Sequence, residues 1–166
     1  GQLCPANGIT ITHQGSIVAP ADAQIFCTTS TGVILARQQS PPWFGALADN
    51  VTDNATAFRK SGEWLAVGGH WHLPPATLKY YVGALGGVYT KTGATYSGYG
   101  AKVRNRATVT TLQGARDFLF WISNVSEVTV QGFSVDGDGN GGSRPVAVST
   151  GDGAVATLGV SQIPPV

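Results

Sequence analysis

The chain has 166 residues and a formal net charge of +1, and only 11% of its residues are charged, whereas 23 are glycine and 9 are proline. Ordinary soluble domains have about 25% charged residues, so we expect partner subunits or further chain to cover much of this weakly charged surface. The net charge provides no general attraction to nucleic acid or anionic lipid, and no apolar run reaches the roughly 18 residues of a membrane span. Nucleic acid and membrane insertion are therefore not expected.

Residues 1–40 are predicted to form a small β-rich module for attachment or oligomerisation. Short β-like runs at 9–12, 24–27 and 33–35 are separated by turn residues, and the Pro41-Pro42 step then removes two backbone donors. About 40 residues is near the lower limit for independent folding, so this module should depend on its own copies or on a docking partner. Cys4 and Cys27 could form a disulfide or remain two small apolar side chains.

The segment 53–66 is the one convincing helix in the sequence. Thr52 or Asp53 can cap its start by accepting backbone N–H bonds, and Phe58 and Leu65 fall on one apolar stripe. The glycine pair at 68–69 is expected to end the helix.

From residue 67 onward the pattern predicts short strands separated by glycines, at 70–73, 78–82, 88–90, 108–112, 118–122, 128–130, 133–135 and 146–148. Val67, Val88, Val109 and Val130 recur every 21 residues, a step that suits one coil of a β-solenoid. A β-sandwich is the alternative, although it would favour cleaner alternation of polar and apolar residues. Either way, the predicted fold class is mainly β.

Several of these residues resemble the entry motif of pectate-lyase-like right-handed parallel β-helices, a family frequent among bacteriophage tailspikes and capsule depolymerases. The matching residues are Phe44-Gly45-Ala46, Asp49, Val51-Thr52-Asp53, Thr56-Ala57-Phe58, Gly68-Gly69 and Leu73-Pro74-Pro75, and the stretch 124–133 is similar to an interior coil. Leu47, Ala48, Asn50 and Ala76 depart from the usual motif.

The resemblance implies that residues 41–166 begin a right-handed parallel β-helix capped by one short α-helix. On this interpretation Asp49 bonds the backbone of its own turn and Asp53 caps the helix. The helix would cover the end of the first coil with Phe58 and Leu65, which protects an apolar layer and unpaired strand edges from solvent.

The resemblance also implies a function, that of the N-terminal part of a phage tailspike-like protein. Such a protein is a homotrimer that is located on the virion tail and is extracellular on release. Residues 1–40 would bind a tail or baseplate protein. The β-helix would recognise host cell-surface polysaccharide. The end at 163–166 lacks a closing cap, so we expect a fragment that is not itself catalytic. The alternatives are a free-standing polysaccharide lyase or glycoside hydrolase of the same fold, and a non-enzymatic glycan-binding module.

Two short motifs contain candidate chemical groups. Asp136 and Asp138 could form the acid pair of a glycosidase or part of a calcium loop, but a glycine-rich turn is the preferred interpretation of DGDGNGG. His70 and His72 place two imidazoles on one strand face, which could begin a zinc site. Such a site needs a third or fourth ligand, and no spacing in the sequence supplies one. Exposed histidines flanking a buried Trp71 are preferred here.

Basic and aromatic residues supply weaker binding candidates. Lys102, Arg104 and Arg106 alternate and could meet an anionic sugar, although a solvated strand face is preferred. Sugar rings stack on flat aromatic faces, so Tyr80, Tyr81, Tyr96 and Tyr99 are candidate substrate-binding residues, some of which must be core. No motif predicts a cofactor or a complete metal site.

Overall fold

The computed structural model describes residues 1–83, 87–105, 119–122, 124–137, 146–148 and 156–162. It is mainly β, as predicted, with one α-helix, α1 (Ala55–Glu63), and one short 3-10 helix, η1 (Pro41–Phe44). The strands are β1 (Thr10–His13), β2 (Val33–Gln39), β3 (Leu65–His72), β4 (Tyr80–Val82), β5 (Val88–Tyr89), β6 (Thr95–Asn105), β7 (Phe120–Ile122), β8 (Val128–Gly137), β9 (Val146–Val148) and β10 (Ala156–Gln162).

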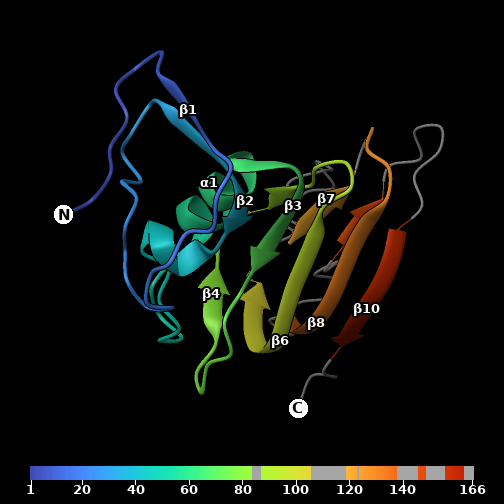
Figure 1. Cartoon of the computed structure of the whole chain (residues 1–166). Helices are drawn as coiled ribbons and strands as arrows, with labels where there is room; N and C mark the ends of the chain where they lie inside the picture. Colours follow the sequence, from blue (N-terminus) through green and yellow to red (C-terminus); the bar gives the residue numbers. More distant parts are fainter. Residues whose placement is uncertain (84–86, 106–118, 123, 138–145, 149–155, 163–166) are drawn as a thin grey trace, which may run out of the picture.

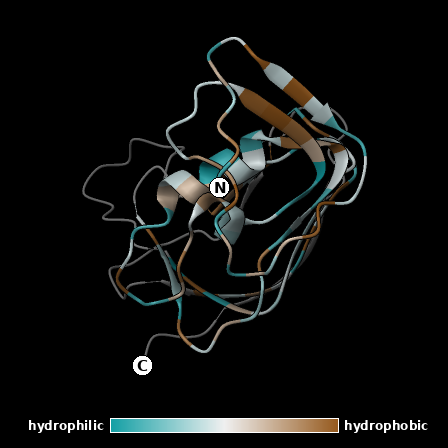
Figure 2. Ribbon diagram, turned by 60° about the vertical axis from the view of Figure 1, so that its left-hand side comes forward, coloured by the Kyte–Doolittle hydropathy of each residue, from teal (hydrophilic) through white to brown (hydrophobic). Residues whose placement is uncertain are grey.

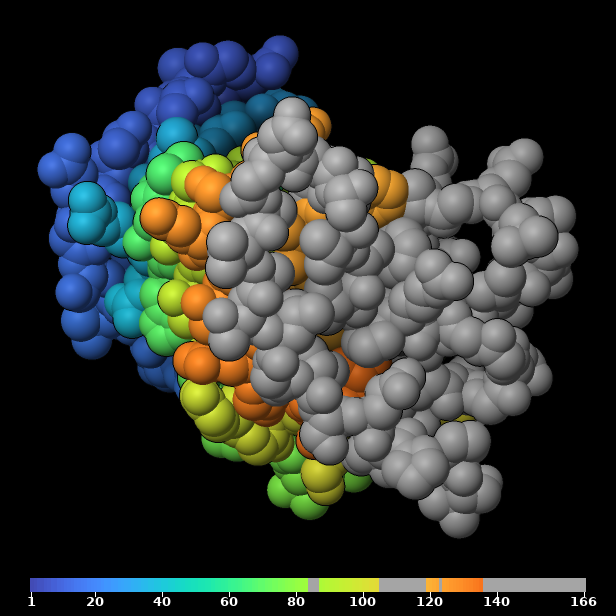
Figure 3. All heavy atoms as spheres, turned by 90° about the vertical axis from the view of Figure 1, so that its right-hand side faces the viewer, coloured from blue at the N-terminus to red at the C-terminus, as the bar shows by residue number. Residues whose placement is uncertain are grey.

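The strands form two sheets, and every described strand pair is parallel. The larger sheet has the order β1-β2-β3-β6-β8-β10, with β4 also paired to β6, and the smaller has the order β5-β7-β9. In Figure 1, β3, β6, β8 and β10 lie side by side. Figure 3 shows the described chain in sequence order across the molecule, from blue through green and yellow to orange.

The strand register shows that the predicted 21-residue period is wrong. His70 pairs with Thr95, 25 residues later, and Thr95 pairs with Thr129, 34 residues later. Val67 is 69% exposed, whereas Val88 is fully buried, so the equally spaced valines do not occupy equivalent positions. The predicted strand at 108–112 lies outside the described residues, as does the valine at 109.

The core lies between the two sheets. Trp71, Tyr96 and Val130 are consecutive register partners in the larger sheet, and all three are fully buried. Phe120, from β7 in the smaller sheet, packs against this row, with its ring centroid 5.6 Å from that of Trp71 and 5.3 Å from that of Tyr96. Aromatic rings from both sheets therefore share one apolar interior.

Helix α1 is shorter than predicted, and Leu65 does not belong to it. The helix ends at Glu63, Trp64 is its C-cap, and Leu65 is already the first residue of β3. The glycine pair at 68–69, expected to stop the helix, lies inside that strand. Leu65 and Phe58 are both buried, but they come from different elements.

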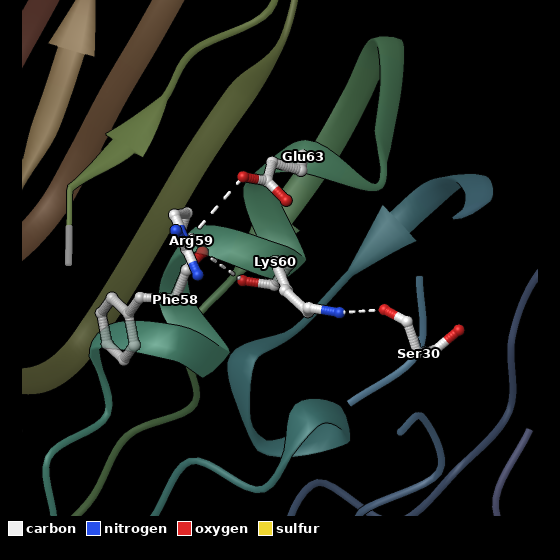
Figure 4. Close-up of polar contacts among 6 residues, drawn as sticks. Ser30, Phe58, Arg59, Lys60 and Glu63 are labelled. Atoms are coloured by element: carbon white, nitrogen blue, oxygen red, sulfur yellow. Dashed lines mark hydrogen bonds and ion pairs between the residues drawn. The ribbon is translucent and has the colours of Figure 1, made fainter. Parts of the chain in front are cut away.

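The buried face of α1 packs against both sheets. The ring centroid of Phe58 lies 5.5 Å from that of Trp71 in β3 and 6.2 Å from that of Tyr80 in β4. At Gly62 an added Cβ would lie only 2.5 Å from Cγ1 of Val88 in β5, so a glycine there allows the helix to approach that strand closely. The opposite face carries Arg59, which pairs with Glu63 (Figure 4).

Residues 1–40 are continuous with the rest of the structure. Strand β2 pairs with β3, and the ring of Phe26 packs against those of Phe44 and Trp64, at centroid distances of 5.0 and 5.6 Å. Figure 2 shows β2 coloured apolar over its first part and hydrophilic at its end. The predicted strand at 24–27 is reduced to one bridge between Leu3 and Phe26.

A disulfide and two hydrogen bonds further stabilise the N-terminal segment. Cys4 and Cys27 form a disulfide with their Cα atoms 5.1 Å apart, which settles a question that their spacing left open. Lys60 of α1 donates a hydrogen bond to the backbone carbonyl of Ser30 (Figure 4), and the Ser30 hydroxyl donates to the carbonyl of Pro5 at 2.5 Å. The disulfide and the Ser30 hydroxyl thus join distant parts of the N-terminal segment, and the Lys60 bond links that segment to the helix.

Candidate functional site

A pocket of about 440 Å³ lies between the N-terminal segment, the end of β2 and β3. One wall is apolar and comes from the segment 17–21, chiefly Ile17, Ala19 and Ala21. The remaining lining residues are Val18, Gln38, Gln39, Ser40, Trp43, His70, His72 and Pro74. None of them is acidic, and none is lysine or arginine. This size lies within the usual range of small-molecule sites, which are mostly apolar with a few placed polar groups.

The turn after β2 places Ser40 and Trp43 in the pocket wall. Ser40 is extended and precedes Pro41 and Pro42, whose missing N–H groups suit the first positions of η1. The N–H of Trp43 donates to the carbonyl of Ser40 at 3.0 Å. The Trp43 carbonyl accepts the N–H groups of residues 25 and 26 at 2.9 and 2.8 Å, so the N-terminal segment holds this tryptophan in place.

Two histidines of β3 form the polar side of the pocket. Gln38 of β2 pairs with His70, and His72 pairs with Ser97 of β6, so these side chains lie on neighbouring strands. The Ser97 hydroxyl lies 2.6 Å from Nε2 of His70 and 3.4 Å from Nδ1 of His72. The imidazole centroids are 6.0 Å apart, and Trp71 between them is fully buried. This confirms a buried Trp71 flanked by an exposed His70, with His72 partly exposed.

Both imidazoles are neutral at pH 7. Partial burial lowers the pKa of each, and the adjacent His70 lowers the pKa of His72 further. In the part of the chain that the structure describes, neither imidazole has a carboxylate partner, and no group of three histidine, cysteine or acidic side chains is arranged to hold a metal ion. The arrangement can therefore exchange hydrogen bonds with a ligand but lacks the ligand set of a zinc site.

Two polar atoms of pocket residues have no partner among the described residues. The indole Nε1 of Trp43, whose side chain is 8% exposed, has no acceptor, and Oε1 of the fully buried Gln39 has no donor. The Gln39 amide nitrogen is satisfied, because it donates to the carbonyls of Ile34 and Trp64 at 3.3 and 3.1 Å. Buried polar groups nearly always have partners, so these two atoms are exceptions, but each has less than 1 Å² of accessible surface and is not open to the pocket.

The chain was compared with protein-family models, curated proteins and solved structures, and none of them matches it. Within the described residues, no helix has the length and apolar character needed to cross a bilayer.

Asp49 bonds its own turn, as predicted. Its carboxylate accepts the Thr52 hydroxyl at 2.5 Å and the N–H groups of Thr52 and Val51 at 2.7 and 2.9 Å. These bonds, that of the Thr52 hydroxyl first, lower the pKa of Asp49 below its usual value. This carboxylate therefore stabilises the backbone of the turn at 49–52.

The predicted capping by Asp53 differs in its details. The N-cap residue is Asn54, not Asp53 or Thr52, and its side chain forms no cap bond. Asp53 instead accepts the N–H of Ala55, the first helical residue, at 2.9 Å.

Asn54 is the key residue that sequence reasoning missed. It is 1% exposed, its Oδ1 accepts the N–H of Leu47 at 2.8 Å, and its Nδ2 lies within 3.0 Å of the carbonyls of Leu47, Thr52 and Tyr81. One buried amide thus joins three separate backbone segments. Nothing in the sequence singles Asn54 out, because it lies among the other polar residues of DNVTDNAT.

The tyrosine candidates divide into core and surface. Tyr96 is fully buried and Tyr80 is 4% exposed, so neither can stack on a sugar, contrary to expectation. Burial raises the pKa of both phenols, that of Tyr80 to about 12. Tyr81 is partly exposed and Tyr99 is 61% exposed, and these two stay predictions.

The remaining charged candidates fall partly outside the described residues. Asp138 and Arg106 both lie there, so neither the acid pair nor the full basic stripe can be placed. Asp136 belongs to β8, where its backbone pairs with that of Arg104. Lys102, also on β6, is exposed.

Proposed function

We propose that this chain is the first part of a tailspike-like protein of a bacteriophage particle. Residues 1–40 attach it to a tail or baseplate protein, and the strands that follow begin a right-handed parallel β-helix used to recognise host polysaccharide. The entry motif from Phe44 to Phe58 supplies the family resemblance. The observation that carries the proposal is the strictly parallel order β3-β6-β8-β10 in one sheet, which β1 and β2 of the N-terminal segment extend at one edge.

This strand order supports successive coils. A chain that leaves a sheet and returns beside its previous strand in the same direction must cross over each time, and such crossovers are nearly always right-handed. The second parallel sheet, β5-β7-β9, supplies strands from the same crossovers. Two parallel sheets that receive strands alternately from one chain support the proposal of β-helix coils.

The packing of α1 supports a capped stack. Phe58 is fully buried against Trp71 and Tyr80, so the helix covers apolar side chains of the first strands after residue 64. A stack of coils needs such cover because its terminal layer is apolar.

Exposed apolar residues support attachment through residues 1–40. All four residues of β1 are exposed, including Ile11, and Leu3 and Ile9 are 50% and 49% exposed. Large exposed apolar side chains on a weakly charged segment are typical of surfaces that bind another protein.

The mass of the purified chain in solution tests the proposal. We expect a species of three times 17.1 kDa by light scattering after size exclusion. The same sample is then incubated with capsular and pectic polysaccharides. A stable monomer would contradict the trimeric spike, and new reducing ends or unsaturated uronates would favour the free-standing enzyme instead.

A further inference from the structure

We infer that His70 and His72 form a two-histidine binding site for a divalent transition-metal ion, with Cu²⁺ as the preferred ion. The inference goes beyond the proposed function, because it requires neither a trimer nor a particle nor a polysaccharide. It rests on the position of the two imidazoles on β3, on the serine hydroxyl that both approach and on the open pocket beside them.

The sheet holds the two imidazoles on one face of β3. They are two residues apart on the strand, so their side chains leave the same face, and the buried Trp71 between them leaves the other. The backbone of His70 pairs with Gln38 of β2 and with Thr95 of β6, so β3 is held from both sides at this point. The two ring centroids lie 6.0 Å apart. The chelating pair is therefore largely organised before a metal ion binds.

One nitrogen of each imidazole faces the same hydroxyl group. Nε2 of His70 lies 2.6 Å from Oγ of Ser97, and Nδ1 of His72 lies 3.4 Å from it. A hydroxyl has one hydrogen, so it can donate to only one of these two nitrogens. A metal ion that displaces the hydroxyl from between them would accept both lone pairs, at the usual metal–nitrogen distance of about 2.0 Å.

The pocket makes the pair accessible to a hydrated ion. Both histidines line it, and His70 is exposed and His72 partly exposed. None of the lining residues is lysine or arginine, so no fixed positive charge in the wall repels a cation. Partial burial lowers the pKa of each imidazole and keeps both neutral at pH 7, which leaves each with a lone pair for the metal.

The ligand set selects the metal. Two imidazole nitrogens, with water in the remaining positions, suit the tetragonal geometry of Cu²⁺ or Ni²⁺. Mg²⁺ and Ca²⁺ bind through oxygen ligands, chiefly carboxylates, and no acidic residue lines the pocket. Zn²⁺ sites usually have three or four protein ligands. For a given set of ligands Cu²⁺ binds more tightly than Ni²⁺ or Zn²⁺, so we expect this order here.

Calorimetric titration of the full chain with CuCl₂, NiCl₂, ZnCl₂ and MgCl₂, at pH 7 in a buffer that does not bind metals, tests the inference. We expect one Cu²⁺ ion per chain, weaker binding of Ni²⁺ and Zn²⁺, and no binding of Mg²⁺. Electron paramagnetic resonance of the Cu²⁺-bound protein should show a tetragonal spectrum with hyperfine splitting from imidazole nitrogen.

The chain has three histidines, so the third provides a matched control. His70→Gln and His72→Gln should each weaken Cu²⁺ binding by at least about tenfold, because even the loss of an outer-shell partner usually costs that much. His13→Gln, at an exposed position on β1, should bind Cu²⁺ as tightly as the wild-type protein. Circular dichroism verifies that each variant is folded.

Four results would overturn the inference. They are an absence of Cu²⁺ binding by the wild-type protein, undiminished binding by the double variant His70→Gln, His72→Gln, loss of binding in His13→Gln, and equal affinity for Cu²⁺ and Mg²⁺. A Cu²⁺ spectrum without nitrogen splitting would also contradict it, whatever the variants show.

Discussion

The carboxylate of Asp53 accepts a hydrogen bond from the backbone N–H of Gly83, 30 residues further along the chain, at 2.9 Å. The same oxygen accepts the N–H of Ala55 at 2.9 Å, so one side chain joins the start of α1 to the segment after β4. We expect Asp53→Ala to lower the free energy of unfolding by about 1 to 2 kcal/mol. Urea denaturation followed by tryptophan fluorescence measures the change.

Two variants check that this effect comes from the acceptor oxygen. Asp53→Asn keeps one carbonyl oxygen and should retain most of the stability. Gly83→Ala would place a Cβ 2.3 Å from Oδ2 of Asp53, so it should displace the carboxylate and destabilise the protein even though residue 53 is unchanged. An Asp53→Asn variant as unstable as Asp53→Ala would contradict this account.

Phe58 should contribute more to stability than any charged residue of α1. Phe58→Ala removes a fully buried ring from contact with Trp71 and Tyr80, and should cost about 3 to 5 kcal/mol. The neighbouring Arg59→Ala is the control, because it removes only an exposed ion pair with Glu63 at 3.9 Å, worth less than about 1 kcal/mol. Equal destabilisation by the two variants would mean that the helix does not cover the core.

The disulfide between Cys4 and Cys27 should hold the N-terminal segment in place. It closes a loop with a sequence separation of 23, for which chain entropy predicts about 3 kcal/mol of stabilisation. The paired replacement of Cys4 and Cys27 by serine should lose this stability and expose residues 1–32 to proteases. Reductant should increase the rate at which proteases cleave the wild-type protein, but it should not change the rate for the double variant. An increase in both proteins would point to another cause.

The pair of histidines should make stability depend on pH near neutrality. Burial lowers the folded-state pKa of His70 and His72 below 6.5, so the unfolded chain binds protons first as the pH falls. Stability is therefore highest above about pH 6.5 and decreases below it. Denaturation midpoints between pH 5 and 8 measure this slope. The double variant His70→Gln, His72→Gln should flatten it, and an unchanged slope would assign the titration to other groups.

The sequence predicted the existence of α1 better than its ends. The apolar stripe through Phe58 identified the helix, but Trp64 and Leu65 follow Glu63 directly and continue the apolar pattern into β3, so no turn residue separates the helix from the strand. The longest described strand, β6, was anticipated only at its end, as the strand face of Lys102 and Arg104, because its first part, TYSGYG, contains Gly98 and Gly100 and has the composition of a turn. Both glycines are needed there: a Cβ at Gly98 would meet the ring of Phe133 at 2.3 Å, and Gly100 has a φ of 77°.

The pocket could not be predicted because its lining comes from three separated stretches. The segment 17–21 has no periodicity, Trp43 follows a proline pair, and His70 was considered only together with His72. Their proximity depends on the register between β2 and β3, where the pairing shifts between Ala36 and Gln38. Such a bulge depends on tertiary packing and leaves no local pattern.

The parallel pairing has a consequence for how the chain acquires its structure. No described strand pairs through a tight hairpin, and partners such as Thr10 and Val33 or Thr95 and Thr129 are 23 and 34 residues apart. A nascent chain leaving the ribosome must therefore expose each strand until a whole further turn has been synthesised. Such high contact order slows folding, and the newest unpaired strand is the point at which self-association competes with the next one.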